Sequence, residues 1–306
     1  MHKASILTIF LPREEIFFIE EWLKYHIAIG FTHFYLYNNM GSRWVDCNNN
    51  LEVTGKNKRN QSIYQLLAHK TDAEVQQDLD RILEPFIAKG YVTQLMWRPK
   101  DENGNITYAP DRAFVDYVRK YARYSDWTSF IDIDEFIVPV SCNNVQDIIE
   151  QIEKQQYTYI TLPQKCFASR FGENSRPVSN VLGILKCNSW ITTEFGKKSL
   201  IKNKTLKAPF LNKTLKVPFT SKTLKVPFIK GRYDDIMHQP TTSRSKFFED
   251  KDIIRFNHYK FNEWELNWVR KNLRPNFELD ASDRDITRLY NLMTRRDLTT
   301  RLKEIR

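Results

Sequence analysis

Hydrophobic and polar residues follow one another along the first half of the chain in blocks that predict strands and helices in turn. The apolar run Ser5–Phe10 is typical of a strand, and apolar residues then recur at helical spacing over Glu14–Ile29 until Gly30 ends the pattern. His33–Tyr37 predicts a second strand, which runs into turn-forming residues at Asn38–Gly41. The chain is therefore expected to begin with a strand–helix–strand unit.

The same alternation continues through the middle of the chain. Thr71–Glu74 has the composition of a helix start, and Gly90 is expected to close that helix. The next expected elements are a strand at Tyr91–Trp97, a helix at Asp111–Tyr124, a strand at Thr128–Asp132, a helix near Val145–Gln155 and a strand near Tyr157–Leu162. A tail from Asp283 onward has apolar residues at helical spacing, at Ile286, Leu289, Met293 and Leu302. This order predicts an α/β fold with a mainly parallel sheet and helices at the C-terminal end.

Composition excludes several classes of protein. Hydrophobic residues make up 41% of the 306 residues and aromatic residues 13%, which is enough for a substantial core and excludes general disorder. No apolar run approaches the roughly 20 residues that a membrane-spanning helix needs. The four cysteines form no Cys-x-x-Cys pair, which argues against a zinc cluster and favours free thiols. These features predict a cytoplasmic protein, with a peripheral position at the inner face of a membrane as the alternative.

The positive charge is concentrated in one segment. The formal net charge is +10, and Phe195–Tyr233 contains eleven basic residues and no acidic ones, which leaves the rest of the chain close to neutral. A nucleic-acid groove would usually spread basic side chains over the fold, so we expect no nucleic-acid partner.

The same segment contains a repeat of nine residues. The three copies are Asn203–Leu211, Asn212–Thr220 and Ser221–Ile229. Each copy contains a proline, which prevents a continuous helix, and three copies are too few for a stacked core. One interpretation is an extended basic strip that contacts an anionic membrane surface. The other, which we favour, is a tandem duplication inside a tolerant surface loop.

The acidic stretch Phe130–Phe136 carries the clearest chemical signal. On a strand, Asp132 and Asp134 would point to the same face while the isoleucines between them face the core. Two adjacent carboxylates repel one another unless a cation lies between them, and oxygen ligands of this kind suit Mg²⁺ or Mn²⁺. An acidic strand end in solvent and a phosphatase motif are the alternatives, and both are weaker here.

The predicted topology places further polar residues at the same edge of the sheet. Ligands of open α/β sheets bind beyond the carboxyl ends of the strands, where this chain has Pro12 and Glu14, then Asn38 and Asn39, then the aspartates. No glycine-rich phosphate loop occurs in the sequence, so another group would have to neutralise any phosphate, and a divalent metal ion is the usual alternative. The pattern predicts a nucleotide-sugar site in which the first two groups contact the base and ribose.

Four segments together resemble a known family. Glu20–His26 with Gly30–Asn39 resembles the N-terminal signature of glycosyltransferase family 92 and its bacterial relatives, and Phe130–Phe136 resembles the metal-binding motif of that family. Asn257–Tyr259 resembles its late histidine motif, and the acidic Asn262–Glu265 follows it. The resemblance covers roughly residues 4–275 and is interrupted by the repeat.

The resemblance implies a GT-A type fold, with a Rossmann-like mixed sheet and helices on both faces. It implies transfer of a hexose from a nucleotide diphosphate sugar, first of all a UDP-sugar, with Mn²⁺ or Mg²⁺ and inversion at the anomeric carbon. A glycan or lipid-linked glycan, in bacterial surface polysaccharide or lipopolysaccharide synthesis, is the expected acceptor. Asp134 is the expected direct metal ligand, Asp132 a second ligand or a ribose or water-mediated contact, and His258 a third ligand.

An inverting transfer also requires a general base for the acceptor hydroxyl. The candidates are Glu194 and Glu173, with a narrow preference for Glu194 because the nearby Trp190 could stack on a sugar. His26 lies within an apolar helix and is expected to be a packing or hydrogen-bonding residue.

The sequence suggests four regions. These are a nucleotide-sugar-binding core at 1–200, the repeat insertion at 201–232, the rest of the catalytic domain with the late histidine motif at 233–275, and an amphipathic helical tail at 276–306. The alternatives to a glycosyltransferase are a non-catalytic sugar- or nucleotide-binding protein and a basic membrane-surface adaptor on the same fold.

Overall fold

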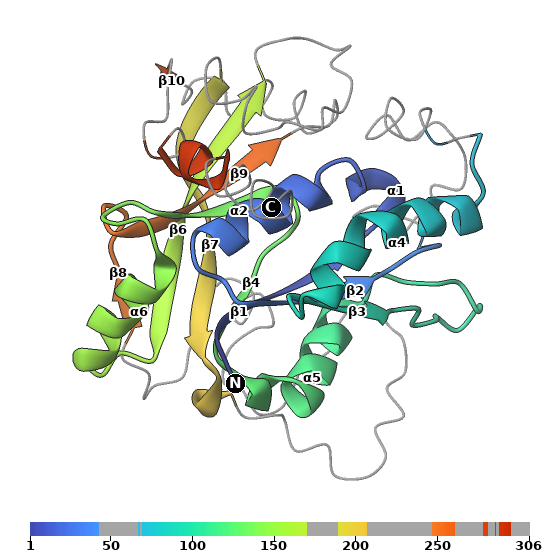
Figure 1. The fold of residues 1–306 in the computed structure, drawn as a ribbon, viewed down its shortest axis with the longest axis horizontal. Helices are drawn as coiled ribbons and strands as arrows, with labels where there is room; N and C mark the ends of the chain where they lie inside the picture. Colours follow the sequence, from blue (N-terminus) through green and yellow to red (C-terminus); the bar gives the residue numbers. More distant parts are fainter. Residues whose placement is uncertain are drawn as a thin grey trace, which may run out of the picture.

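The computed structural model describes residues 1–42, 67, 69–169, 189–206, 247–260, 278–280, 285 and 288–294. Four parallel strands form the first half of one sheet (Figure 1). They are β1 (His2–Phe10), β2 (His33–Asn38), β3 (Val92–Met96) and β4 (Ser125–Phe130). Their order is β3-β2-β1-β4, with every neighbouring pair parallel, so this half agrees with the predicted strand–helix–strand order.

The second half of the sheet is mixed. It contains β5 (Glu135–Pro139), β6 (Tyr159–Ser169), β7 (Ser189–Lys202), β8 (Phe247–Glu249), β9 (Ile254–Lys260) and β10 (Glu278–Asp280). The order continues as β4-β7-β6-β9-β5, with β8 beside β6 and β10 beside β7. The pairs β4–β7, β6–β7, β5–β9 and β7–β10 are antiparallel, whereas β6–β9 and β6–β8 are parallel. The expectation of a mainly parallel sheet therefore holds for the first half only.

Most predicted helices are present with shifted ends. They are α1 (Pro12–Glu15), α2 (Ile19–Ala28), α4 (Asp72–Ala88), α5 (Pro110–Lys120) and α6 (Val145–Lys154), with two short 3₁₀ helices, η1 (Ala122–Tyr124) and η2 (Asn203–Thr205). Thr71 and Glu74 form a reciprocal capping box at the start of α4, as the sequence indicates. Residues 288–294 are helical, and Leu289 and Met293 of the predicted tail helix are buried there.

The first predicted helix is divided into α1 and α2. Ile16, Phe18 and Ile19 are all buried. At 3.6 residues per turn, Ile16 and Phe18 would point to nearly opposite sides of one straight helix. The chain turns at residues 16–18 instead, and α2 begins afresh at Ile19. Burial of adjacent large side chains thus overrides helical continuity.

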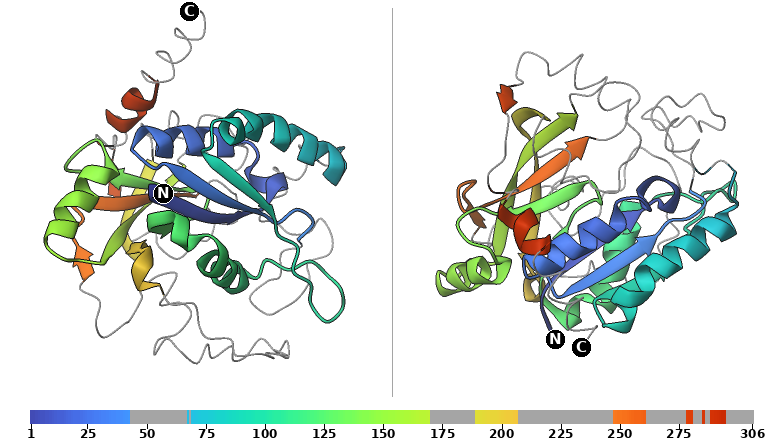
Figure 2. Two further views of the ribbon diagram at one scale, coloured as in Figure 1. Left: turned by 60° about the horizontal axis from the view of Figure 1, so that its bottom comes forward. Right: turned by 45° about the horizontal axis from the view of Figure 1, so that its top comes forward.

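Helices cover both faces of the sheet, as the resemblance implies (Figure 2). Successive residues of β1 point to opposite faces. Ile6 packs in a large core with side chains of α2, α4 and α6, whereas Leu7 packs in a smaller core beneath α5. The structure is therefore an α/β fold with a Rossmann-like mixed sheet, and within the described residues no helix is long and apolar enough to span a membrane.

Candidate active site

The acidic residues lie in the turn that connects β4 to β5. β4 ends at Phe130, two residues earlier than predicted, and Asp132 and Asp134 precede the first residue of β5, Glu135. The backbone N–H of Glu135 donates a hydrogen bond of 3.1 Å to the carbonyl of Asp132 and closes this turn. The prediction that both aspartates lie on one face of a strand is wrong, because side chains in a turn do not follow strand alternation.

Each aspartate has its own basic partner. Lys198 Nζ of β7 lies 3.0 Å from Asp132 Oδ2, and His258 Nε2 of β9 lies 3.0 Å from Asp134 Oδ2. Three segments that are far apart in sequence therefore meet at this turn. The structure brings Asp134 and His258 together as expected, but it pairs Asp132 with a lysine that the sequence analysis did not select.

His258 is held in place from several sides. It lies opposite Glu135 in the antiparallel pairing of β5 with β9, and the next residue, Tyr259, donates its backbone N–H to the carbonyl of Asp134 at 2.9 Å. Nδ1 of His258 lies 3.1 Å from the side-chain amide nitrogen of Gln164, which donates to it. Nε2 is consequently the ring nitrogen that faces Asp134.

Lys198 is a buried cation shared by two carboxylates. Its side chain is 6% exposed, and Nζ lies 3.0 Å from Glu135 Oε2 as well as 3.0 Å from Asp132 Oδ2. Glu135 is 2% exposed, and its Oε2 also accepts the backbone N–H of Asp132 at 2.9 Å. The sequence analysis counted Lys198 with the basic segment. The available signal was its spacing of two from the buried Leu200, which places both on one face of the strand.

The ionisable groups of the site shift one another's pKa values. Burial raises the pKa of Glu135, and Lys198 acts against this shift. Burial favours a lower pKa for Lys198, but Asp132 and Glu135 outweigh it and raise that pKa above its ordinary value. The pKa of Glu15, at the end of α1, is raised well above its ordinary value by burial and by Glu14, with smaller contributions from both aspartates. Glu15 therefore belongs to the same electrostatic environment, and the sequence analysis did not select it.

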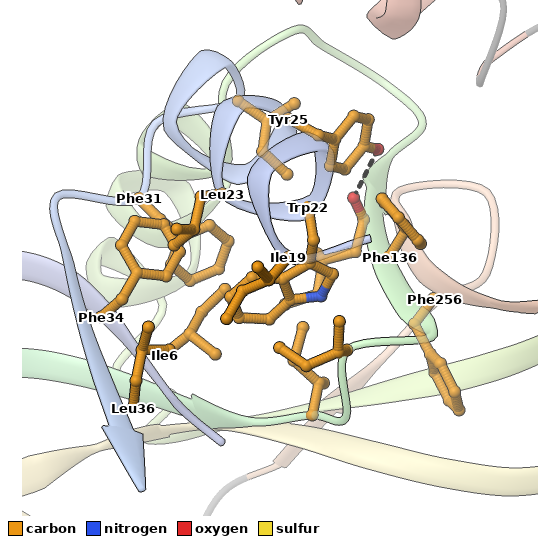
Figure 3. Close-up of a cluster of buried hydrophobic side chains, with 14 of the residues drawn as sticks. Ile6, Ile19, Trp22, Leu23, Tyr25, Phe31, Phe34, Leu36, Phe136 and Phe256 are labelled. Carbon is orange, nitrogen blue, oxygen red and sulfur yellow. Dashed lines mark hydrogen bonds between the residues drawn. The ribbon is translucent and has the colours of Figure 1, made fainter. Parts of the chain in front are cut away.

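Helix α2 fixes the strand that follows the acidic turn. β5 is the last strand in the order, and side chains of α2 satisfy its outer backbone groups. Trp22 donates to the carbonyl of Glu135 at 2.8 Å. Tyr25 donates to the carbonyl of Ile137 at 2.7 Å, the hydrogen bond that is dashed in Figure 3. His26 Nε2 accepts the backbone N–H of Ile137 at 3.2 Å. The aromatic part of the Glu20–His26 motif thus positions β5 rather than contacting a ligand directly.

The residues after β1 form the short helix α1. Pro12 is buried at its first position, and Glu14 is partly exposed on it. Arg13 between them binds Asp72 at 2.6 Å and so ties α1 to the start of α4. The contacts of Pro12 and Glu14 with a nucleotide remain predictions.

Asn38, the last residue of β2, and Asn39, which follows it, are fully buried. The Asn38 amide donates to Gln76 Oε1 at 2.8 Å. The Asn39 amide donates to the carbonyls of Trp97 at 2.7 Å and Thr107 at 3.1 Å. Asn38 therefore binds helix α4, and Asn39 holds the segment between β3 and α5. The expected nucleotide contacts of both residues remain predictions without support from this geometry.

The two candidate bases are placed unequally. Glu194 lies in β7 where the pairing with β6 shifts between Pro163 and Lys165, so its backbone passes Gln164, the residue that contacts His258. The described side chains do not include that of Glu194, and Glu173 lies outside the described residues.

Most of the nine-residue repeat lies outside the described residues. Asn203, the first repeat residue, is buried and hydrogen-bonded to the backbone of the 3₁₀ turn before β4, so the core extends beyond the expected boundary at residue 200.

The side chains at the acidic turn include some, but not all, of the ligands expected for a divalent cation. Asp134 and His258 offer a carboxylate oxygen and an imidazole nitrogen, the ligand types that suit Mn²⁺, and they are close enough to bind one ion. Asp132, the third expected ligand, is engaged by Lys198. Among the described residues no group of three or more histidine, cysteine, aspartate or glutamate side chains is arranged to hold a metal.

Solved structures resemble this chain only distantly. The structure of S. aureus TarS aligns at 12% identity with a TM-score of 0.33, covering 68% of this chain and 30% of that one. S. aureus TarS 1–349 in complex with UDP-GlcNAc aligns at 13% identity with a TM-score of 0.30, covering 66% and 45%. UDP-glucose pyrophosphorylase complexed with UDP-glucose aligns at 8% identity with a TM-score of 0.31, covering 67% and 77%. This chain spans less than half the length of both TarS chains, and these similarities carry no functional argument.

The sequence of the chain shows which family it belongs to. No curated protein matches the chain. The model of glycosyltransferase family 92 matches residues 69–295, a span that contains the acidic turn, Lys198 and His258. The prediction of an enzyme of the glycosyltransferase class is confirmed at the level of the family. The chain belongs to glycosyltransferase family 92.

Proposed function

We propose that this protein transfers a hexose from a nucleotide diphosphate sugar, with a UDP-sugar as the first candidate, to a hydroxyl of a glycan or lipid-linked glycan. The observation that carries the proposal is the pairing of Asp134 with His258 beside the partly exposed Asp132, next to the carboxyl ends of parallel β1 and β4. Ligands of open α/β sheets bind at such ends. Family membership supports the transferase class.

Asp134 and His258 would hold the divalent cation, Mn²⁺ or Mg²⁺. When bound, such an ion neutralises the charge that develops on the leaving diphosphate. Gln164 and the β5–β9 pairing keep the imidazole of His258 directed at Asp134, so these two side chains would need little reorganisation to bind an ion. Asp132 is 42% exposed and is the carboxylate that a ribose hydroxyl or a bridging water would contact.

We propose a single displacement with inversion. The bond from the acceptor oxygen to the anomeric carbon forms as the bond from that carbon to the phosphate oxygen breaks. The hydroxyl proton passes to a carboxylate base, and the nucleoside diphosphate leaves. Glu194 is the preferred base because its backbone runs beside Gln164 at the site, and Glu173 remains the second candidate. A role in surface polysaccharide or lipopolysaccharide synthesis, at the inner face of the membrane, completes the proposal on the family resemblance alone.

A donor screen tests the function. The melting temperature of the protein would be measured with a panel of nucleotide sugars in the presence and absence of Mn²⁺, because a ligand that binds only the folded state raises it. Release of UDP from the donors that stabilise the protein would then be followed. We expect one UDP-hexose to give both stabilisation and slow hydrolysis, with the hydrolysis lost in Asp134→Asn. Stabilisation without any turnover, with or without acceptors, would favour a sugar-binding protein instead.

A further inference from the structure

We propose that Lys198 is a fixed positive charge in the site that binds the sugar donor. It balances Asp132 and Glu135 so that a nucleotide diphosphate can approach, and it competes with a divalent cation for Asp132. The identity of the diphosphate rests on the proposed function, whereas the competition concerns only side chains of this chain.

The geometry of Lys198 is that of a fixed charge. The side chain is 6% exposed, and its ammonium lies at 3.0 Å from one oxygen of each carboxylate. An ammonium has three N–H donors, and these two contacts take two of them. A buried cation without partners is strongly destabilising, so Lys198 is held against the two carboxylates.

The two carboxylates differ in what can reach them. Glu135 is 2% exposed and cannot be contacted by a ligand of any size, so its role is to hold the ammonium and the backbone of the turn. Asp132 is 42% exposed, so the same ammonium also lies behind a carboxylate that solvent and ligands can reach. Lys198 therefore delivers positive charge to an accessible point of the site.

The site needs this charge. Three carboxylates gather in the turn and at its end, those of Asp132, Asp134 and Glu135, and an anionic diphosphate would be repelled by them. The ammonium takes one lone-pair direction of Asp132 Oδ2 and offsets the negative charge of this carboxylate, which lowers its attraction for a divalent cation. The contact with Lys198 thus explains why only Asp134 and His258, of the three expected ligands, are paired with each other.

The double variant Lys198→Met with Glu135→Gln removes the cation and its buried partner together, which avoids leaving an unpaired charge in the interior. Binding of Mn²⁺ would be measured by titration calorimetry without nucleotide, and binding of UDP in the presence of EDTA. The double variant keeps the net charge of the site, because it removes one positive and one negative charge, but it leaves the exposed Asp132 without its cation. Relative to the wild type, we therefore expect Mn²⁺ to bind about tenfold more tightly and UDP about tenfold more weakly, each equivalent to about 1.4 kcal/mol. Lys198→Arg keeps the positive charge, so its UDP affinity should stay close to that of the wild type.

Lys202 provides the matched control. It lies on the same strand, and its Nζ is 2.6 Å from Glu153, which is not part of the acidic turn. Lys202→Met should change neither affinity. Equal or weaker Mn²⁺ binding by a folded double variant, or no Mn²⁺ binding by either protein, would overturn the competition. Failure of the wild type to bind UDP while the Mn²⁺ result holds would count against the proposed function and leave the competition standing.

Discussion

The ends of β2 and β4 each carry a pair of polar residues, but one pair is buried and the other is partly exposed. Asn38 ends β2 and Asn39 follows it, and both are fully buried and donate hydrogen bonds to neighbouring segments. Asp132 and Asp134 follow β4, are partly exposed and face basic side chains from β7 and β9. The rule that ligands bind at the carboxyl ends of strands selects both pairs. A side chain there is available to a ligand only if it reaches the surface, and of these two pairs only the aspartates meet that condition.

The largest effect is expected at the β4 end. Asp134→Asn keeps the volume of the side chain but removes its negative charge beside His258. We expect kcat/KM for donor transfer to fall about 100-fold or more, the scale on which loss of one group that stabilises transition-state charge is felt. The melting temperature should change little, because Asp134 is partly exposed.

His258→Ala tests the other residue of the same pair. It should reduce activity less, because the aspartates remain. Full activity of a folded Asp134→Asn protein in Mn²⁺ would show that Asp134 is not a required metal ligand and that the two strand ends do not differ in this way.

A change at the β2 end should act on stability instead. Asn39→Ala removes an amide that donates to two carbonyls, those of Trp97 and Thr107. Leaving buried carbonyls without a donor costs about 1–3 kcal/mol of the free energy of unfolding. Urea denaturation measures this loss, and donor turnover per folded molecule should stay the same. A selective rise in donor KM with unchanged stability would show that Asn39 contacts the nucleotide after all.

The buried His26 should also act on stability, and its effect should depend on pH. His26 is fully buried, bonds the Trp22 carbonyl through Nδ1 at 2.8 Å, and burial lowers its pKa to about 3 from the ordinary 6.5. Between those values the unfolded chain binds a proton that the folded protein does not, so stability falls as the pH drops from 6.5 towards 3. His26 alone should cost about 2 kcal/mol between pH 7 and pH 5.

Urea denaturation at pH 7 and pH 5 measures that loss. His26→Gln, whose amide can still donate and accept, is the comparison, and its stability should depend less on pH over this interval. Equal pH dependence of the two proteins would show that His26 takes up a proton without unfolding.

The smallest effect is expected in the repeat. Deleting Asn212–Thr220 should leave turnover of soluble substrates unchanged, because shortening a loop by one of three copies alters closure entropy by well under about 1 kcal/mol. The deletion removes two lysines, so any binding to anionic vesicles should weaken by up to about 2 kcal/mol at low salt and not at high salt. Paired turnover and vesicle co-sedimentation assays test this. Loss of turnover would make the repeat part of the active-site wall.

Local signals in the sequence determined the local structure. The apolar runs of β1 and β2, the capping box of α4 and the apolar faces of α4 and α6 each depend on residues a few positions apart, so their patterns are visible in the chain. The division of the first helix was not visible in this way, because burial of Ile16 and Phe18 depends on what packs against them.

The sequence by itself also determined the family, and its expectation that Asp134 and His258 lie together is confirmed by their contact of 3.0 Å, whereas their role in metal binding stays a prediction. Only the tertiary structure decided that the aspartates lie in a turn, that Lys198 is buried between Asp132 and Glu135, and that Asn38 and Asn39 are used internally. A sequence shows the charge of a lysine but not its surroundings. The sheet order β4-β7-β6-β9-β5 brings residues more than a hundred positions apart into contact, and that long-range pairing sets which charges meet.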